Sequence, residues 1–465
     1  MIYPIVLCVV VATLCGVTII KTLGVKNRTD FLVAGRSLPW PVLVFTLLSS
    51  WIGAGSLFAG AELAYKNGFA ALWQSAGGWV GLVVIYFVAG RARRFAKFTI
   101  PDLLEARYNA AARVLATIAI VISYVTITSY QFKAGGDILH LIFPSLERDT
   151  GMYVVSAFVI AFTAAAGMAS IAYLDLVIGA LVTVAVVIAV PVLLARGGGW
   201  AQVRHALPDT HFQVFGNLSP VQALGFLLPT ALLLIGNQGM YQKFFSARSE
   251  RDAKYSVVGW VIGTVTLETL LVTLAVIGSA QFHTDRPREI IPLTARLGLP
   301  QWIGAVLMGG VFAKVISTAN NYLFSPATNL IHDVYARFIR KVASERETMA
   351  VSRVIVLVLG LYAVIQATQF ESILAQALYA YTIYGAAITP VVMAAFFWKR
   401  TTTAGAIASI ACGAVVTLVA KQIGYDPDLA VYPALAASLV AMVVVSLLTP
   451  PPAAEKLKPF FAPAP

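Results

Sequence analysis

Apolar stretches of about twenty residues recur along the whole sequence, separated by short polar segments. An α-helix of that length spans the hydrocarbon core of a bilayer, and runs so long and so uniformly apolar do not fit the strands of a membrane β-barrel. We therefore expect an all-α integral membrane protein with about thirteen transmembrane helices. The predicted helices are at residues 3–22, 40–65, 69–90, 112–132, 152–172, 175–196, 222–242, 255–280, 301–330, 353–370, 373–397, 403–422 and 430–449.

The composition agrees with a chain that lies mostly in lipid. Hydrophobic residues make up 59% of the sequence and charged residues 12%, and the mean hydropathy is +0.82. The polar segments are too short for a separately folded soluble domain, and there is no GxxxxGK[ST] phosphate loop, so a kinase or an ATPase is not favoured. Cys8, Cys15 and Cys412 all fall in apolar stretches and indicate neither a disulfide framework nor a zinc site.

The basic residues, which give a formal net charge of +12, are distributed unevenly between alternate loops. Most of the 33 lysines and arginines fall on one set of loops, in blocks that include Arg91–Arg113, Lys243–Lys254 and Arg337–Arg353. Because cytoplasmic loops are enriched in Lys and Arg, we expect a multi-pass protein of the plasma (inner) membrane with its N-terminus outside and its C-terminus in the cytoplasm. The charge then sets topology, and nucleic acid is not an expected partner.

Two of the predicted helices contain glycine clusters next to polar residues at a depth close to mid-membrane. The clusters are Ser49–Ser56 in the second helix and Ile235–Lys243 in the seventh. Paired glycine-interrupted spans are typical of transporters built from inverted repeats, in which the breaks expose backbone groups to a central site. Small residues can also simply permit close helix packing. We expect a single transporter domain over residues 1–465, with LeuT-like inverted five-helix repeats at about 40–196 and 222–397, and a disordered cytoplasmic tail at 450–465.

Lys314 lies within the apolar stretch 301–330, three and four residues before Ser317 and Thr318. That spacing places the three side chains on one helix face. Ionisable residues inside a membrane are expensive, and they usually mark ion paths, substrate sites or paired charges. The structural interpretation is an ion pair that joins two helices, and the functional one is a cation or substrate site. Two further carboxylates, Glu62 and Glu268, could serve a proton path or lie near the interfaces.

Several motifs, in order along residues 30 to about 415, resemble the sodium:solute symporter family, which includes bacterial proline, galactose and sialic acid symporters. The stretches that carry the resemblance are Asp30–Pro39, Trp51–Gly55, Ala64–Gly68, Phe98–Tyr108, Tyr241–Ala253, Ile316–Ala319 and Phe397–Arg400. The resemblance implies thirteen helices with the N-terminus outside, two inverted five-helix repeats, and alternating access to a central site.

The resemblance also implies a sodium site between the second and ninth helices. Its ligands would be the backbone carbonyls of Ser49, Ile52 and Lys314 and the hydroxyls of Ser317 and Thr318. The family's aspartate at the start of the sixth helix corresponds to Asp175, toward the cytoplasmic exit of the ion. Solute-lining positions of the family correspond to Ser56, Ser75, Asn237 and Met240, although each could equally make a helix-packing hydrogen bond.

The sequence departs from the family at residue 314, which is usually alanine, and at Asn320, where many members have aspartate. Three arrangements of Lys314 are open. It could replace the ion as an internal cation paired with Asp175, it could bind a solute carboxylate, or it could reach Asp175 while its own carbonyl holds Na⁺.

The expected function is therefore cation-coupled symport, with Na⁺ as coupling ion, of a small organic solute by alternating access. The alternatives are a Na⁺-independent or proton-coupled transporter in which Lys314 replaces the ion, and a non-transporting membrane sensor module. The expected partners are the solute, Na⁺ or H⁺, and the lipid bilayer, with no organic cofactor and no obligate protein partner. An enzyme is not favoured, because no nucleophile motif or metal cluster falls at membrane depth.

Overall fold

The computed structural model describes residues 2–22, 34–95, 99–165, 168–340, 344–370 and 372–461. Over these ranges the regular structure is helical, and one isolated bridge pairs Leu38 with Ala247. Eleven helical segments within the same ranges are long and apolar enough to cross a membrane. The predicted all-α membrane architecture is thus confirmed, whereas the number of thirteen spans is not.

The first part of the chain, from Ile2 to Phe212, contains long helices and the short connections between them. Its elements are α1 (Ile2–Thr22), η1 (Ala34–Arg36), α3 (Trp40–Trp51), η2 (Gly55–Ala59), α4 (Gly60–Asn67), η3 (Gly68–Ala71), α5 (Leu72–Phe95), α6 (Ile100–Arg107), α7 (Ala110–Ile142), α8 (Arg148–Ala165), α9 (Met168–Arg196), α10 (Gly199–Ala206) and η4 (Asp209–Phe212).

The second part of the chain, from Pro220 onward, also contains a broken helix, at the junction of α11 and α12. Its elements are α11 (Pro220–Gly236), α12 (Gln238–Ser246), α13 (Glu250–Gln281), η5 (Pro287–Glu289), α14 (Ile290–Leu297), α15 (Gln301–Asn329), η6 (Leu330–Ile339), α16 (Glu345–Ala367), α17 (Ile373–Ala387), α18 (Thr389–Phe397), α19 (Thr403–Gln422), α20 (Val431–Leu448) and α21 (Ala454–Phe461).

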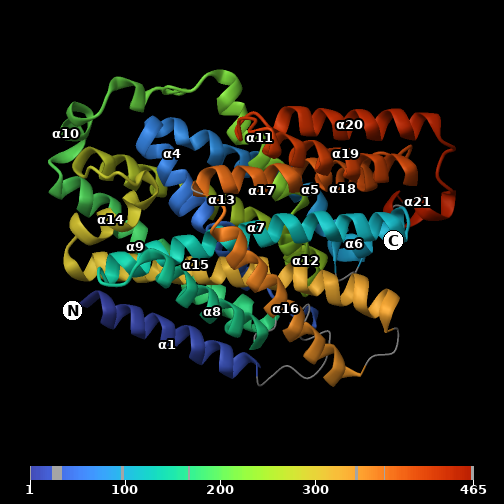
Figure 1. Ribbon diagram of the computed structural model, residues 1–465, viewed down its shortest axis with the longest axis horizontal. Coiled ribbons are helices and arrows are strands. Elements are labelled where there is room, and N and C mark those ends of the chain that lie inside the picture. The colour runs from blue at the N-terminus through green and yellow to red at the C-terminus, as the bar shows by residue number, and fades with distance from the viewer. Residues whose placement is uncertain are drawn as a thin grey trace.

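Figure 1 shows how these helices are arranged along the long axis of the molecule. Helix α1 lies along one edge and packs on α15, and α19 and α20 pack together along another edge. The N-terminus lies at the end of the molecule that holds α10 and α14, and the C-terminus lies at the end with α6 and α21. Helix α15 also packs on α7 and α9. It is central, since 83% of the residues in the most apolar stretch of the span Gln301–Ile339 are buried inside the protein.

Both glycine clusters coincide with helix breaks. Helix α3 ends at Trp51 because Ile52 adopts an extended backbone (φ −82°, ψ 103°), and the chain resumes helical structure in the π-helix η2. Helix α11 ends at Gly236, where Asn237 is extended (φ −63°, ψ 112°) and its side chain caps α12. The break after Trp51 is one reason for the smaller number of spans, because α3 is only 12 residues long.

The expectation of a disordered tail at 450–465 is wrong for its described part. Residues 454–461 form α21, which packs against α6 and α18. Phe460 is buried between Phe95 and Phe396, with ring centroids 4.3 Å and 5.9 Å away. Burial of an aromatic side chain stabilises a short helix that the proline-rich composition alone would not predict. Residues 462–465 lie outside the described ranges.

Candidate functional site

The break at the end of α3 brings the backbone oxygens of Ser49 and Ile52 next to α15. The Thr318 hydroxyl donates to the carbonyl oxygens of both Ser49 and Ile52, at 3.4 Å each. The close approach depends on Gly53, since a Cβ at that position would lie only 2.6 Å from the Thr318 side chain. The structure therefore brings together three of the sequence-predicted ion ligands in one oxygen-lined seam, which we call the α3–α15 seam.

Asp175 of α9 lies at the same contact between α3 and α15. Its side chain is fully buried and accepts hydrogen bonds from Thr46 at 2.7 Å and from Ser50 at 3.4 Å. From α15, the Ser317 hydroxyl and the Asn321 amide (3.3 Å) also donate to this carboxylate. The predicted residues Asp175 and Ser317 are therefore in direct contact, and Ser317 is the chain neighbour of Thr318 in the seam.

Two lysines lie near this carboxylate. The Lys314 ammonium is fully buried, interacts electrostatically with Asp175, and has no hydrogen-bond partner among the described residues. No ion pair within 4.0 Å joins it to Asp175 in the described ranges. Lys243, expected at the start of a cytoplasmic basic block, is instead 1% exposed and donates to Asn321 at 2.8 Å. Asn321 thus connects Lys243 to Asp175.

A narrow cavity of about 20 Å³ lies on the other side of the broken helix. It is lined by residues of α3, η2, α4, α5, α11, α13 and α17, and the predicted solute residues Ser56 and Ser75 are among them. A volume of this size holds about one water molecule. Glu268 of α13 also lines it, and its carboxylate accepts hydrogen bonds from Trp51, Trp79 and Ser56.

The other two predicted solute residues lie elsewhere. The Asn237 amide accepts from Tyr124 at 2.8 Å and donates to Tyr322 at 3.1 Å, within a cluster of buried tyrosines. Met240 is 1% exposed and does not line the cavity that Ser56 and Ser75 share. The structure thus places Asn237 and Met240 in the packed interior around the second break.

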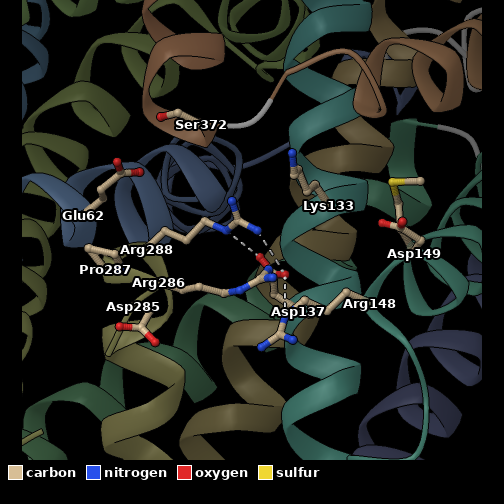
Figure 2. Close-up of a pocket in the computed structure, with 11 residues that line it drawn as sticks. Glu62, Lys133, Asp137, Arg148, Asp149, Asp285, Arg286, Pro287, Arg288 and Ser372 are labelled. Carbon is tan, nitrogen blue, oxygen red and sulfur yellow. Dashed lines mark hydrogen bonds and ion pairs between the residues drawn. The ribbon is translucent and has the colours of Figure 1, made fainter. Parts of the chain in front are cut away.

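A much larger cavity, of about 460 Å³, opens at the end of the molecule where α8 begins, and we call it the outer pocket. Figure 2 shows the arginines of its wall pointing toward Asp137. Arg288 and Arg148 pair with Asp137 at 2.8 Å and 3.4 Å, and Arg148 also makes two hydrogen bonds to Glu289, at 3.0 Å and 3.1 Å.

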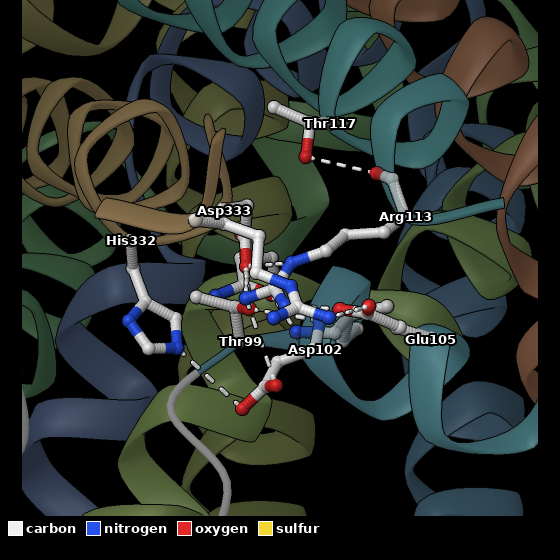
Figure 3. A network of polar contacts seen from close by, with 10 residues as sticks. Thr99, Asp102, Glu105, Arg113, Thr117, His332 and Asp333 are labelled. Carbon is white, nitrogen blue, oxygen red and sulfur yellow. Dashed lines mark hydrogen bonds and ion pairs between the residues drawn. The ribbon is translucent and has the colours of Figure 1, made fainter. Parts of the chain in front are cut away.

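A second charged network lies at the opposite end of the bundle and joins α6, α7 and η6 (Figure 3). Arg113 of α7 donates to Asp333 at 2.8 Å and to Glu105, and Thr99 donates to Asp333 at 2.9 Å. Arg337 pairs with Glu105 at 2.8 Å. Burial acts to raise the pKa of Glu105, but the hydrogen bonds from Arg337 and Arg113 outweigh it and hold this pKa below the usual value.

Comparison with known proteins identifies the family. The sequence profile of the sodium:solute symporter family matches residues 31–413. The chain belongs to the sodium:solute symporter family. The high-affinity proline transporter PutP of Bacillus subtilis (strain 168) is 26% identical over 92% of this chain and 94% of its own length. The sodium/proline symporter of Escherichia coli (strain K12) is 26% identical over 97% of this chain and 94% of its own length.

Solved structures share the fold of this family member. A Na⁺-coupled sialic acid symporter in a substrate-bound outward-open state superposes with a TM-score of 0.83 at 16% identity, over 97% of this chain and 98% of that one. MhsT in complex with L-phenylalanine gives 0.56 at 11% identity, over 87% of this chain and 97% of that one. The secondary-transporter prediction and its LeuT-like architecture are confirmed, and membership of a transporter family favours this function over a sensor module.

Two features of the site were missed by sequence reasoning. Lys243 was assigned to a loop because it begins a basic block, although the helix that precedes it continues to Ser246. Glu268 was noticed as an intramembrane acid but was not placed beside Ser56 and Ser75, with which it lines the cavity of about 20 Å³. The three side chains that donate to it come from α3, η2 and α5, so no local pattern around Glu268 indicates its partners.

Proposed function

We propose that this protein couples the entry of Na⁺ to the uptake of a small organic solute of the amino-acid class. The observation that carries the proposal is the α3–α15 seam, where two carbonyl oxygens and the Thr318 hydroxyl converge at a helix break. Carbonyls of an unwound transmembrane segment are typical Na⁺ ligands in transporters with inverted repeats. The buried Ser49 hydroxyl, which has no hydrogen-bond partner among the described residues, is a further oxygen that fits a hard cation.

The neighbouring charges support a site that binds the ion weakly enough to release it. Asp175 contributes a negative charge nearby, while Lys314 and Lys243 contribute positive charge around it. When Na⁺ is bound, it supplies a positive charge that links α3 of the first repeat to α15 of the second. The ion therefore favours a particular relative position of the two helices, which is what coupling by alternating access requires.

The proline specificity of the relatives supports an amino-acid-type solute for this chain. The distribution of basic residues supports a plasma-membrane orientation with the outer pocket facing the exterior. In this arrangement the solute enters through the outer pocket, reaches the cavity beside Ser56 and Ser75, and leaves after the network around Arg113 opens.

The test is uptake of radiolabelled L-proline and other amino acids into proteoliposomes, driven by an inward Na⁺ gradient or by K⁺ alone. Thr318→Val keeps the shape of the side chain and removes the hydroxyl, so we expect the Na⁺ concentration for half-maximal uptake to rise at least about tenfold. Stabilisation of the purified protein against heat by Na⁺ should weaken in parallel. Thr417→Val, which removes a buried hydroxyl in α19 far from the seam, is the matched control.

Uptake by the wild type that is equal in Na⁺ and K⁺ would contradict the sodium site. A second candidate, in which the Lys314 ammonium takes the place of the ion, is favoured by the absence of any hydrogen-bond partner for this buried group in the described residues. It predicts uptake without Na⁺ in the wild type and Na⁺-dependent uptake only in Lys314→Ala.

A further inference from the structure

Glu268 is the buried acid in the wall of the solute cavity, and its carboxylate is held in a fixed position. It is 3% exposed and lies in the middle of α13. Trp51 donates to one carboxylate oxygen at 3.0 Å, Trp79 donates to the other at 3.0 Å, and Ser56 adds a longer bond of 3.3 Å. The donors come from α3, α5 and η2, so three separate elements orient this one side chain.

All three donors are neutral. No lysine, arginine or histidine forms an ion pair with Glu268 in the described part of the chain. Hydrogen bonds from neutral donors offset only part of the free energy that it costs to bury a carboxylate. Transfer of a charge out of water is far more costly than transfer of a neutral polar group. The residues that pack against Glu268 therefore supply no counter-charge for a carboxylate at this position.

The open side of this carboxylate faces the cavity that also contains Ser56 and Ser75. Two aromatic side chains, Trp51 and Tyr381 of α17, are among the residues that line it, together with small polar and apolar residues. A carboxylate next to aromatic rings favours a protonated amine, because the carboxylate and the rings both attract a cation. The rings can also pack against an apolar ring of the solute that carries the amine. A neutral polyol would gain little from this combination.

We propose that Glu268 binds the protonated amino group of the transported solute, which restricts the substrate to amino or imino acids. This inference rests on the proposed transport function and names its substrate class. Trp51 precedes Ile52, whose carbonyl belongs to the α3–α15 seam, so the amine site and the ion site share one turn of broken helix. Because the cavity has a volume of only about 20 Å³, the solute must widen it on entry, and it does so by moving the walls that also hold the seam.

The first test measures equilibrium binding of L-proline to the purified full-length protein in Na⁺, with tetrahydrofuran-2-carboxylate as the matched compound that lacks the amine. Other amino acids and their amine-free analogues are compared in the same way. We expect the wild type to prefer the amine-bearing member of each pair by at least about tenfold. Glu268→Gln, which keeps the size of the side chain and removes its charge, should lose that preference.

Two controls separate loss of the amine site from misfolding. Glu250→Gln removes an exposed carboxylate at the start of the same helix and should bind as the wild type does. Trp79→Phe removes one donor to Glu268 but leaves its charge, so it should weaken amine binding less than Glu268→Gln does. For each variant, thermal stabilisation by Na⁺ reports whether the seam is still intact.

The outcomes distinguish this inference from the sodium site. Equal binding of proline-type and amine-free compounds by the wild type, or unchanged preference in Glu268→Gln, would overturn the role of Glu268. Preference for the amine that is lost in Glu268→Gln supports it, whether or not Na⁺ stabilises the protein. If Glu268→Gln loses the preference for the amine but Na⁺ does not stabilise the wild type against heat, the sodium site is refuted and the role of Glu268 still stands.

Discussion

At the scale of single residues, the most unusual group is Lys314, a buried amine with no hydrogen-bond partner among the described residues. It lies one turn before Thr318, so its charge acts on any cation in the α3–α15 seam. Two unit charges about 8 Å apart at an effective dielectric constant of ~20 repel by ~2 kcal/mol. Asp175 offsets part of this repulsion, since it interacts with the same lysine.

We therefore expect Lys314→Met to bind Na⁺ more tightly than the wild type. Methionine fills a similar volume without the charge, so the Na⁺ concentration for half-maximal solute uptake should fall roughly tenfold. The measurement is a Na⁺ activation curve in proteoliposomes at fixed solute concentration. Lys421→Met, at the exposed end of α19, removes a lysine far from the seam and should leave the curve unchanged. An unchanged or weaker Na⁺ dependence in Lys314→Met would contradict the repulsion.

The residues of the seam could be predicted, while the residues around them could not. Ile52 and Thr318 lie in short motifs that resemble those of the family, and Ser49 lies three residues before Ile52, so the resemblance was sufficient to name all three as candidates. Lys243 and Glu268 act through partners on other helices, namely Asn321 for the first and Trp51 and Trp79 for the second. Contacts of that kind depend on how the helices pack, and a single sequence does not contain that information.

At the scale of the elements, the network in Figure 3 holds α6, α7 and η6 together at one end of the bundle. Arg113 and Arg337 both pair with Glu105, but the Arg113 side chain is 4% exposed and that of Arg337 is 51% exposed. A buried ion pair that loses one partner leaves an uncompensated charge, whereas an exposed pair contributes little. The two arginines therefore have very different expected effects.

We expect Arg113→Gln to lower the thermal unfolding temperature in detergent by at least ~5 °C, because Asp333 loses its buried counter-charge. The same substitution at Arg337 is the matched control and should change the temperature by no more than ~1 °C. Differential scanning fluorimetry of the purified proteins measures both. Equal shifts in the two variants would show that burial of the Arg113 pair does not stabilise this end of the bundle.

Hydropathy predicts the helices well and their ends poorly. The glycine clusters were sufficient to locate both breaks, because glycine next to polar residues is unfavourable in a continuous span. The prediction of a disordered tail was wrong because α21 is short and proline-containing, while Phe460 packs against Phe95 and Phe396 of other elements. Local composition cannot report such a docking contact.

At the scale of the whole molecule, the two ends of the bundle differ. The outer pocket has a volume of about 460 Å³, whereas the cavity lined by Ser56 and Ser75 has about 20 Å³. The opposite end is joined across three elements by the Arg113 network. The end of the molecule with the N-terminus therefore holds a wide pocket, whereas the end with the C-terminus is joined by buried ion pairs.

Helix α13 offers a direct test of orientation, because its 32 residues would extend over ~48 Å and separate two exposed side chains. Lys254 lies near its start, and Asp285 follows its end in the wall of the outer pocket. If the N-terminus is outside, a membrane-impermeant maleimide should label Asp285→Cys in intact cells, and Lys254→Cys only after the membrane is permeabilised.

Cys8, Cys15 and Cys412 are replaced by serine in both variants, so that each reports a single thiol. The opposite pattern would invert the topology inferred from the basic loops. It would also make the larger pocket cytoplasmic, and the solute would then meet the Arg113 network first.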